Sequence, residues 1–138
     1  MINPIEHSRT KESAQKYKVE PYSIPADVYG SGNLAGRGGW TWYTGSSSWY
    51  YIAGIEYILG MKIRNKTLYL KPCVPADWKE FGIKYKYENS VYNISFLNPN
   101  GKNTGVSSIT LNGAKIEDIT SGIALDPGGG LFDIEVVM

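Results

Sequence analysis

The stretch Ser46–Gly60, SSSWYYIAGIEYILG, decides how this 138-residue chain is interpreted. Serine is a favoured residue at the start of a helix, and glycine is favoured just past the end of one. The residues between them therefore predict a helix over Ser46–Leu59. Apolar side chains surround much of its circumference, namely those of Trp49, Ile52, Ala53, Ile55, Ile58 and Leu59.

A helix that is apolar nearly all round has to be covered on several sides. Only about 45 residues precede this one, too few to bury it easily. The helix therefore predicts that more protein precedes it than these 138 residues supply.

The residues after Gly60 are typical of short strands and polar turns. KIRNKTLYLKP, residues 62–72, predicts a hairpin that turns at Asn65-Lys66. GIKYKYENSVYNISFLN, residues 82–98, alternates, and predicts Tyr92, Ile94 and Phe96 as an inner face. Asn112-Gly113 predicts a tight turn, and LFDIEVVM, residues 131–138, a closing strand. This half is predicted to be an antiparallel sheet or sandwich.

The residues before the helix predict less regular structure. Thr10–Lys18 is predicted to be a short helix capped by Thr10, because good helix formers follow the threonine. Glu20–Tyr29 is predicted to be a second short helix, with Pro21 in its first turn. Ser31–Thr44 is predicted to be a glycine-rich loop.

Composition excludes several classes of function. The net charge of +1 does not indicate the basic surface that nucleic-acid-binding proteins carry. No apolar run reaches the ~20 residues that span a bilayer. Cys73 is the single cysteine, which excludes an internal disulfide and favours a reducing, cytoplasmic location. With one cysteine and one histidine, no metal site of the zinc type is expected.

The residues around the start of the helix are the candidate binding residues. Thr44 and Gly45 precede amides that lack partners inside the helix and that favour an anion such as phosphate. The alternative is an ordinary helix cap. Arg37 can bind an anion or remain a solvated loop residue, and Trp40 and Trp42 can stack on sugar rings or pack in a core.

Five blocks occur in order: INPIEHSRT, YKVEPYSIPADVY, GRGGWTWYTGSSSWYY, GIEYILGMK and LKPCVPADW. Together they resemble the C-terminal region of the cellobiose phosphorylase and cyclic β-1,2-glucan synthase group, which is glycoside hydrolase family 94. The resemblance implies an α+β fold, in which the last helices of an (α/α)6 barrel are followed by an antiparallel β-sheet or sandwich. Residues 1–61 would be those helices, and residues 62–138 the β domain.

The resemblance also implies chemistry. Members of the family cleave a β-glucosidic bond with inorganic phosphate and invert the anomeric carbon, while an aspartic acid protonates the leaving oxygen. The family's Thr-Gly before the last barrel helix contacts that phosphate, and Thr44 and Gly45 occupy these positions. Arg37, Trp40 and Trp42 are candidate sugar or anion contacts. Phosphate is a co-substrate, so no cofactor is implied.

The aspartic acid of the family lies in an Asp-Trp-Asn-Asp type segment, which these 138 residues do not contain. His7, Asp27 and Asp77 do not match the family's catalytic or phosphate-binding residues. No catalytic residue is therefore assigned, and the chain alone is predicted to be inactive. The leading hypothesis is a fragment of a carbohydrate-active phosphorylase or glycosyltransferase, which binds carbohydrate and phosphate and associates with the missing barrel or with itself. The alternatives are a free-standing carbohydrate-binding module and a self-associating structural domain.

Overall fold

The computed structural model describes residues 4–20, 23–41, 45 and 47–138. It divides into two compact units, Met1–Tyr51 and Ile52–Met138. The predicted assignment of residues 1–61 to barrel helices and of residues 62–138 to a separate domain stays a prediction. Between them the units combine helices with sheets that are mostly antiparallel, so the chain is of the α+β class. None of the described helices is long and apolar enough to cross a membrane.

The first unit is built around one buried tyrosine. It contains helices α1 (Pro4–His7) and α2 (Lys11–Tyr17), the 3-10 turn η1 (Gly32–Leu34), and the short strands β1 (Asp27–Val28) and β2 (Gly38–Gly39). Thr10 caps α2 by accepting a hydrogen bond from the amide of Ser13, so the predicted helix is confirmed. Tyr17 is buried and stacks on the ring of His7 with 4.1 Å between ring centroids, and burial raises the pKa of its hydroxyl.

The predicted helix over Glu20–Tyr29 is wrong. Its described residues are not helical, and Asp27 and Val28 form β1, which pairs antiparallel with β2 in the glycine-rich segment. A proline pair at residues 21 and 25 fits an extended path as well as a first helical turn. Pairing with a strand ten residues away selects the extended path.

The predicted helix over Ser46–Leu59 is present from Ser47, whereas Ser46 lies outside the described residues. Its first part is α3 (Ser47–Ile52), but the second part, η3 (Ala53–Ile58), is a wider π-helix that the sequence did not predict. The amide of Leu59 donates to the carbonyl of Gly54, five residues back, at 2.8 Å. A complete turn of π-helix is rare, and such turns occur frequently at functional sites.

This helix leaves much of its apolar surface uncovered. Ile55 packs against the core of the second unit. The exposed apolar side chains are those of Trp49, Tyr50, Tyr51, Ile52, Tyr57 and Ile58, with 74% of Trp49 and 63% of Tyr57 accessible to solvent. Within the part of the chain that the structure describes, several apolar side chains of this helix are therefore exposed.

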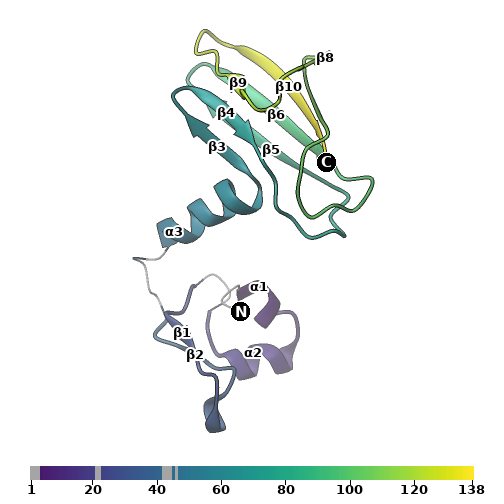
Figure 1. Ribbon diagram of the computed structural model, residues 1–138. Coiled ribbons are helices and arrows are strands. Elements are labelled where there is room, and N and C mark those ends of the chain that lie inside the picture. The colour runs from purple at the N-terminus through teal and green to yellow at the C-terminus, as the bar shows by residue number, and fades with distance from the viewer. Residues whose placement is uncertain (1–3, 21–22, 42–44, 46) are drawn as a thin grey trace. The chain divides into compact units, whose positions relative to one another are not determined.

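Two sheets form the second unit (Figure 1). The three-stranded sheet has the order β3-β4-β9, with strands Met61–Arg64, Thr67–Leu70 and Ile123–Ala124. The five-stranded sheet has the order β5-β6-β10-β7-β8, with strands Glu80–Tyr87, Ser90–Leu97, Gly130–Val137, Ser108–Leu111 and Ala114–Lys115. The predicted turns at Asn65-Lys66 and Asn112-Gly113 are confirmed, and all four of these residues have positive φ angles between 49° and 80°.

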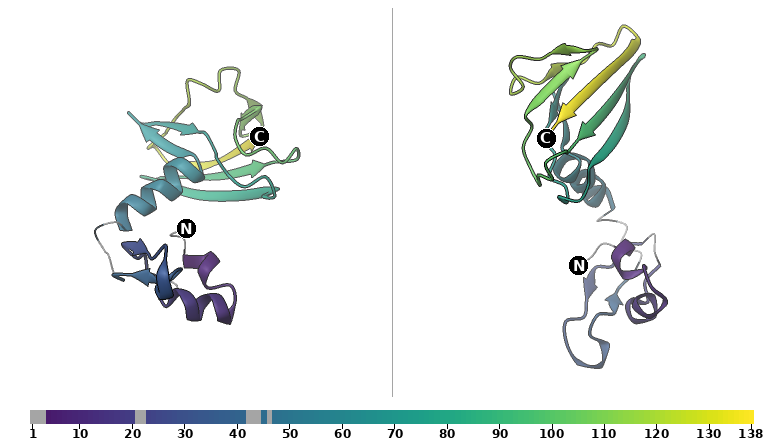
Figure 2. Two further views of the ribbon diagram at one scale, coloured as in Figure 1. Left: turned by 60° about the horizontal axis from the view of Figure 1, so that its bottom comes forward. Right: turned by 90° about the vertical axis from the view of Figure 1, so that its right-hand side faces the viewer.

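The last strand corrects the expectation of a purely antiparallel sheet. β10 lies between β6 and β7, runs parallel to β6 over eight residue pairs, and runs antiparallel to β7 (Figure 2). Its central position explains its composition, because Ile134 and Val136 are buried on one face. A strand with neighbours on both sides also leaves no edge of its own for another chain to pair with.

One hydrophobic core lies against both sheets. The inner face of β6 is buried as predicted, because Tyr92, Ile94 and Phe96 are each at most 1% exposed. The three-stranded sheet contributes Met61, Leu68, Leu70 and Ile123 to the same cluster. The second unit thus has a core of its own to which η3 is attached by Ile55.

Candidate functional site

Arg37 and Trp40 line the same cavity of the first unit. This cavity measures about 480 Å³. Its wall consists of the end of α2, the segment after it and the β1–β2 region, with lining residues Lys18, Glu20, Tyr29, Leu34, Arg37, Gly38, Gly39, Trp40 and Thr41. Two of these residues are cations and one is a carboxylate, so the cavity is polar with an aromatic wall. Such a composition suits a ligand that carries both hydroxyls and negative charge.

Backbone hydrogen bonds fix the loop that carries Arg37. Its amide donates to the carbonyl of Leu34, and its carbonyl accepts from the amide of Tyr29, both at 2.9 Å. Gly38 and Gly39 follow directly, where the chain passes too close to its neighbours for a side chain. A Cβ at Gly38 would lie 2.2 Å from Val19 Cγ2, and one at Gly39 2.1 Å from Asp27 Oδ1. The guanidinium thus projects from an anchored loop.

Trp40 has a left-handed backbone, with φ of 49°, and 76% of it is exposed. A bulky residue in this conformation is uncommon, and strain of this kind concentrates at binding sites. Its carbonyl accepts a hydrogen bond from Ala26 at 3.2 Å, which ties the strained residue to the start of β1. Among the described residues the ring of Trp40 is exposed, and its role as a sugar or anion contact stays a prediction.

The remaining candidates are described only in part. Trp42 and Thr44 lie outside the described residues. Gly45 is exposed, and no atom of the described residues lies within 4 Å of the point where a Cβ would stand. The role of Gly45 in binding phosphate stays a prediction.

Lys18 and Glu20 were missed by sequence reasoning. Lys18 is the C-cap of α2 and has a left-handed backbone, with φ of 54°. This turn of the chain brings both charged residues to the wall of the cavity that Arg37 and Trp40 line. The charged residues on either side of Val19 were the available signal, but the incorrect helix over Glu20–Tyr29 obscured it.

Glu56 is a structural acid. Its carboxylate accepts a hydrogen bond from Arg64 at 3.1 Å and lies 3.4 Å from the ammonium of Lys62. Partial desolvation raises the pKa of Glu56, but the hydrogen bonds and charges of Arg64 and Lys62 outweigh it and hold the pKa below its usual value. These contacts join η3 to β3. Among the described residues, no group of three His, Cys, Asp or Glu side chains is placed to bind a metal ion.

Comparison with known proteins connects this chain to one family. The sequence profile described as the glycosyl hydrolase 94 superfamily, catalytic domain, matches residues 1–60. The cyclic beta-(1,2)-glucan synthase NdvB of Rhizobium meliloti (strain 1021) is 38% identical over 125 residues, which cover 91% of this chain and 4% of that protein.

Two phosphorylases are similar over most of the same length. The N,N'-diacetylchitobiose phosphorylase of Vibrio furnissii is 35% identical over 121 residues, covering 87% of this chain and 15% of that enzyme. The solabiose phosphorylase of Paenibacillus borealis is 30% identical over 115 residues, covering 83% and 14% respectively. The chain therefore spans less than a sixth of the length of these relatives. On the match of residues 1–60 and these relatives, the chain belongs to glycoside hydrolase family 94.

Proposed function

We propose that this chain forms part of the phosphate site of a glycoside phosphorylase or glycosyltransferase that acts on β-glucosides or β-glucans. Thr44 and Gly45 bind phosphate, while Arg37, Trp40 and Trp42 contact the sugar or the anion. The observation that carries this proposal is the cavity that Arg37 and Trp40 share, since they lie seven and four residues before Thr44 in the sequence. Relatives named as phosphorylases support it.

The proposed role of these residues is to position phosphate. In an inverting reaction, phosphate attacks the anomeric carbon from the side opposite the leaving group. Backbone amides at Thr44 and Gly45, with a threonine hydroxyl, would hold phosphate on that line without a rearrangement during the reaction. Arg37 would supply positive charge. The acid that protonates the leaving oxygen is not among the residues assigned here, so we propose that the chain alone is inactive.

We further propose that residues 1–61 are the last helices of an (α/α)6 barrel. The exposed apolar side chains of α3 and η3 support this arrangement, because neighbouring barrel helices would cover them. The exposed free thiol of Cys73 is consistent with a reducing compartment, and we place the protein in the cytoplasm.

Phosphate is expected to bind the isolated chain without turnover. Titration with phosphate, at constant ionic strength, should change tryptophan fluorescence in a saturable way. Arg37→Gln should weaken this binding at least fivefold, because it removes the cation of the cavity loop. Incubation with cellobiose and phosphate should release no glucose 1-phosphate.

Arg9→Gln is the matched control, because Arg9 is an exposed arginine of the same unit that pairs with Glu6 at 2.7 Å. It should change phosphate affinity less than twofold. Equal effects of the two substitutions would contradict the role of Arg37, and release of glucose 1-phosphate would contradict the proposed inactivity. Binding of glucan without any response to phosphate would favour the carbohydrate-binding module, which the exposed ring of Trp40 also allows.

Self-association of the chain is a second expected result. An apolar surface without cover favours contact with another copy, so sedimentation velocity should show dimers or larger species at micromolar concentration. The double substitution Ile52→Ser and Ile58→Ser should weaken this association at least tenfold, since both side chains are exposed on the helix. Leu131→Ser removes an exposed leucine from β10 and should leave association unchanged. A wild-type chain that stays monomeric at high concentration would contradict this expectation.

A further inference from the structure

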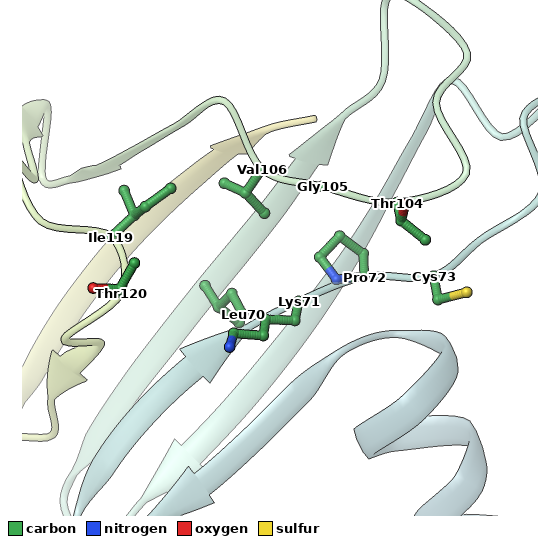
Figure 3. Close-up of a pocket in the computed structure, with 9 residues that line it drawn as sticks. All are labelled: Leu70, Lys71, Pro72, Cys73, Thr104, Gly105, Val106, Ile119 and Thr120. Carbon is green, nitrogen blue, oxygen red and sulfur yellow. The ribbon is translucent and has the colours of Figure 1, made fainter.

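The second unit contains a cleft that the proposed phosphate site does not use. It measures about 400 Å³ and opens between the segment after β4 and two loops that precede and follow the β7–β8 hairpin. Figure 3 shows the side chains of Leu70, Val106 and Ile119 around this space. Leu70 is buried in the core, and Val106 and Ile119 are half-buried against it. The interior of the cleft is therefore apolar and continuous with the core.

Both sides of the cleft are anchored by hydrogen bonds. On one side, Cys73 and Thr104 form an antiparallel bridge, and the amide of Val74 donates to the carbonyl of Asn103 at 2.9 Å. On the other side, the Asp118 carboxylate accepts hydrogen bonds from the hydroxyls of Ser121 and Thr120, at 2.5 and 2.6 Å. These hydrogen bonds lower the pKa of Asp118 to about 2. These hydrogen bonds connect Asp118 to Thr120 and Ser121, on either side of which the chain continues along the cleft.

The lining of the cleft carries one charged side chain, and the Asp118 carboxylate lies beside the lining residues Ile119 and Thr120. Lys71 is the only charged residue among those that line it, and Thr104 and Thr120 are exposed at its rim. Among the residues that the structure describes, the ammonium of Lys71 makes no ion pair. An apolar interior with one unpaired cation complements a ligand with an apolar body and one negative charge.

We propose that this cleft is a binding site for a small amphiphilic anion, an aryl or acyl carboxylate or sulfonate, whose apolar body contacts Val106 and Ile119 and whose charge pairs with Lys71. The site is separate from the proposed phosphate site, since all of its residues belong to the second unit. Its volume lies within the ~300–1,000 Å³ usual for small-molecule sites.

The test uses two fluorescent probes of similar apolar shape, of which one carries a charge. The anion 8-anilinonaphthalene-1-sulfonate should bind the 138-residue chain at this cleft, and the uncharged N-phenyl-1-naphthylamine should bind more weakly. Lys71→Gln should weaken binding of the sulfonate about fivefold and leave the uncharged probe within twofold. Lys84→Gln, which removes an exposed lysine of β5, should change neither.

Two variants locate the probes. Val106→Trp fills the cleft and should abolish this binding of both probes. Thr104→Glu places a negative charge at an exposed rim position, where the fold is easily kept, and should weaken binding of the sulfonate alone. The Ile52→Ser, Ile58→Ser background removes apolar helix surface that also attracts such probes. If Thr104→Glu and Lys71→Gln leave sulfonate binding in that background unchanged, the proposal is wrong.

Discussion

Gly60→Ala is expected to lower the free energy of unfolding of the second unit by about 3 kcal/mol or more. Gly60 follows the π-helix with a left-handed φ of 75°. A Cβ at this position would lie 2.1 Å from the carbonyl carbon of Lys71, which is backbone and cannot rotate away. The amide of Lys71 also donates to the carbonyl of Gly60 at 2.8 Å, so a shift would break the bond that joins the helix end to the sheet.

Gly113→Ala separates the cost of the left-handed backbone from the cost of the close approach to the Lys71 backbone. Gly113 has a similar φ of 80°, but no atom lies within 4 Å of its missing Cβ. This control should therefore lose only the ~1 kcal/mol of the left-handed conformation. Thermal unfolding followed by circular dichroism measures both, with ~4–8 °C per kcal/mol for a domain of this size. Equal losses in the two variants would show that the close approach to Lys71 does not matter.

Asn98→Ala should cost about 3 kcal/mol in the same unit. Asn98 is fully buried at the end of β6. Its amide nitrogen donates to the carbonyls of Trp78 and Lys102 at 3.0 and 2.8 Å, and its side-chain oxygen accepts from the amide of Lys102 at 2.8 Å. Alanine would leave three backbone groups without this partner, and it would also open a void beside the core.

Asn103→Ala is the control, since Asn103 is exposed and makes one side-chain bond, to the carbonyl of Val74 at 3.2 Å. It should cost less than 1 kcal/mol.

Asn98→Asp should be as harmful as alanine at pH 7, because a carboxylate cannot donate to the two carbonyls. Its loss should shrink at low pH, where the protonated acid can donate to one of the two carbonyls. Urea unfolding at pH 7 and pH 4 measures this difference, and a loss independent of pH would contradict it.

Local turn chemistry explains what the sequence predicted well. Asn65-Lys66 and Asn112-Gly113 adopt the positive φ angles of tight turns, so each hairpin is specified by residues adjacent in the chain. The position of β10 is specified differently. Its pairing with β6 joins residues about 40 positions apart, and no local pattern distinguishes a parallel neighbour from an antiparallel one.

The structure differs from the sequence prediction in two other segments, and in both the local pattern could not distinguish the alternatives. The π-helix over Ala53–Ile58 is too short for its wider period to be separated from that of an α-helix by its apolar pattern. β1 consists of Asp27 and Val28 alone, and these two residues are a strand because they pair with Gly39 and Gly38, which lie 10 to 12 positions later in the chain.

The candidate site was predicted in part. Arg37 and Trp40 were chosen for their chemistry, and the structure brings them to one cavity. Lys18 and Glu20 reach that cavity because α2 ends in a left-handed residue, Lys18. The sequence does not predict this conformation, because lysine rarely adopts it. Trp42 and Thr44 lie outside the described residues, so their roles stay predictions.

The most direct test of the proposed phosphate site is the amide of Gly45, observed by two-dimensional NMR during titration of the ¹⁵N-labelled chain with inorganic phosphate. The proposal predicts a saturable shift of the Gly45 amide resonance, with the affinity reduced at least fivefold by Thr44→Val, and no such shift with chloride at equal ionic strength. A Gly45 resonance that does not move with phosphate, or that moves equally in the Thr44→Val chain, would contradict the proposed function.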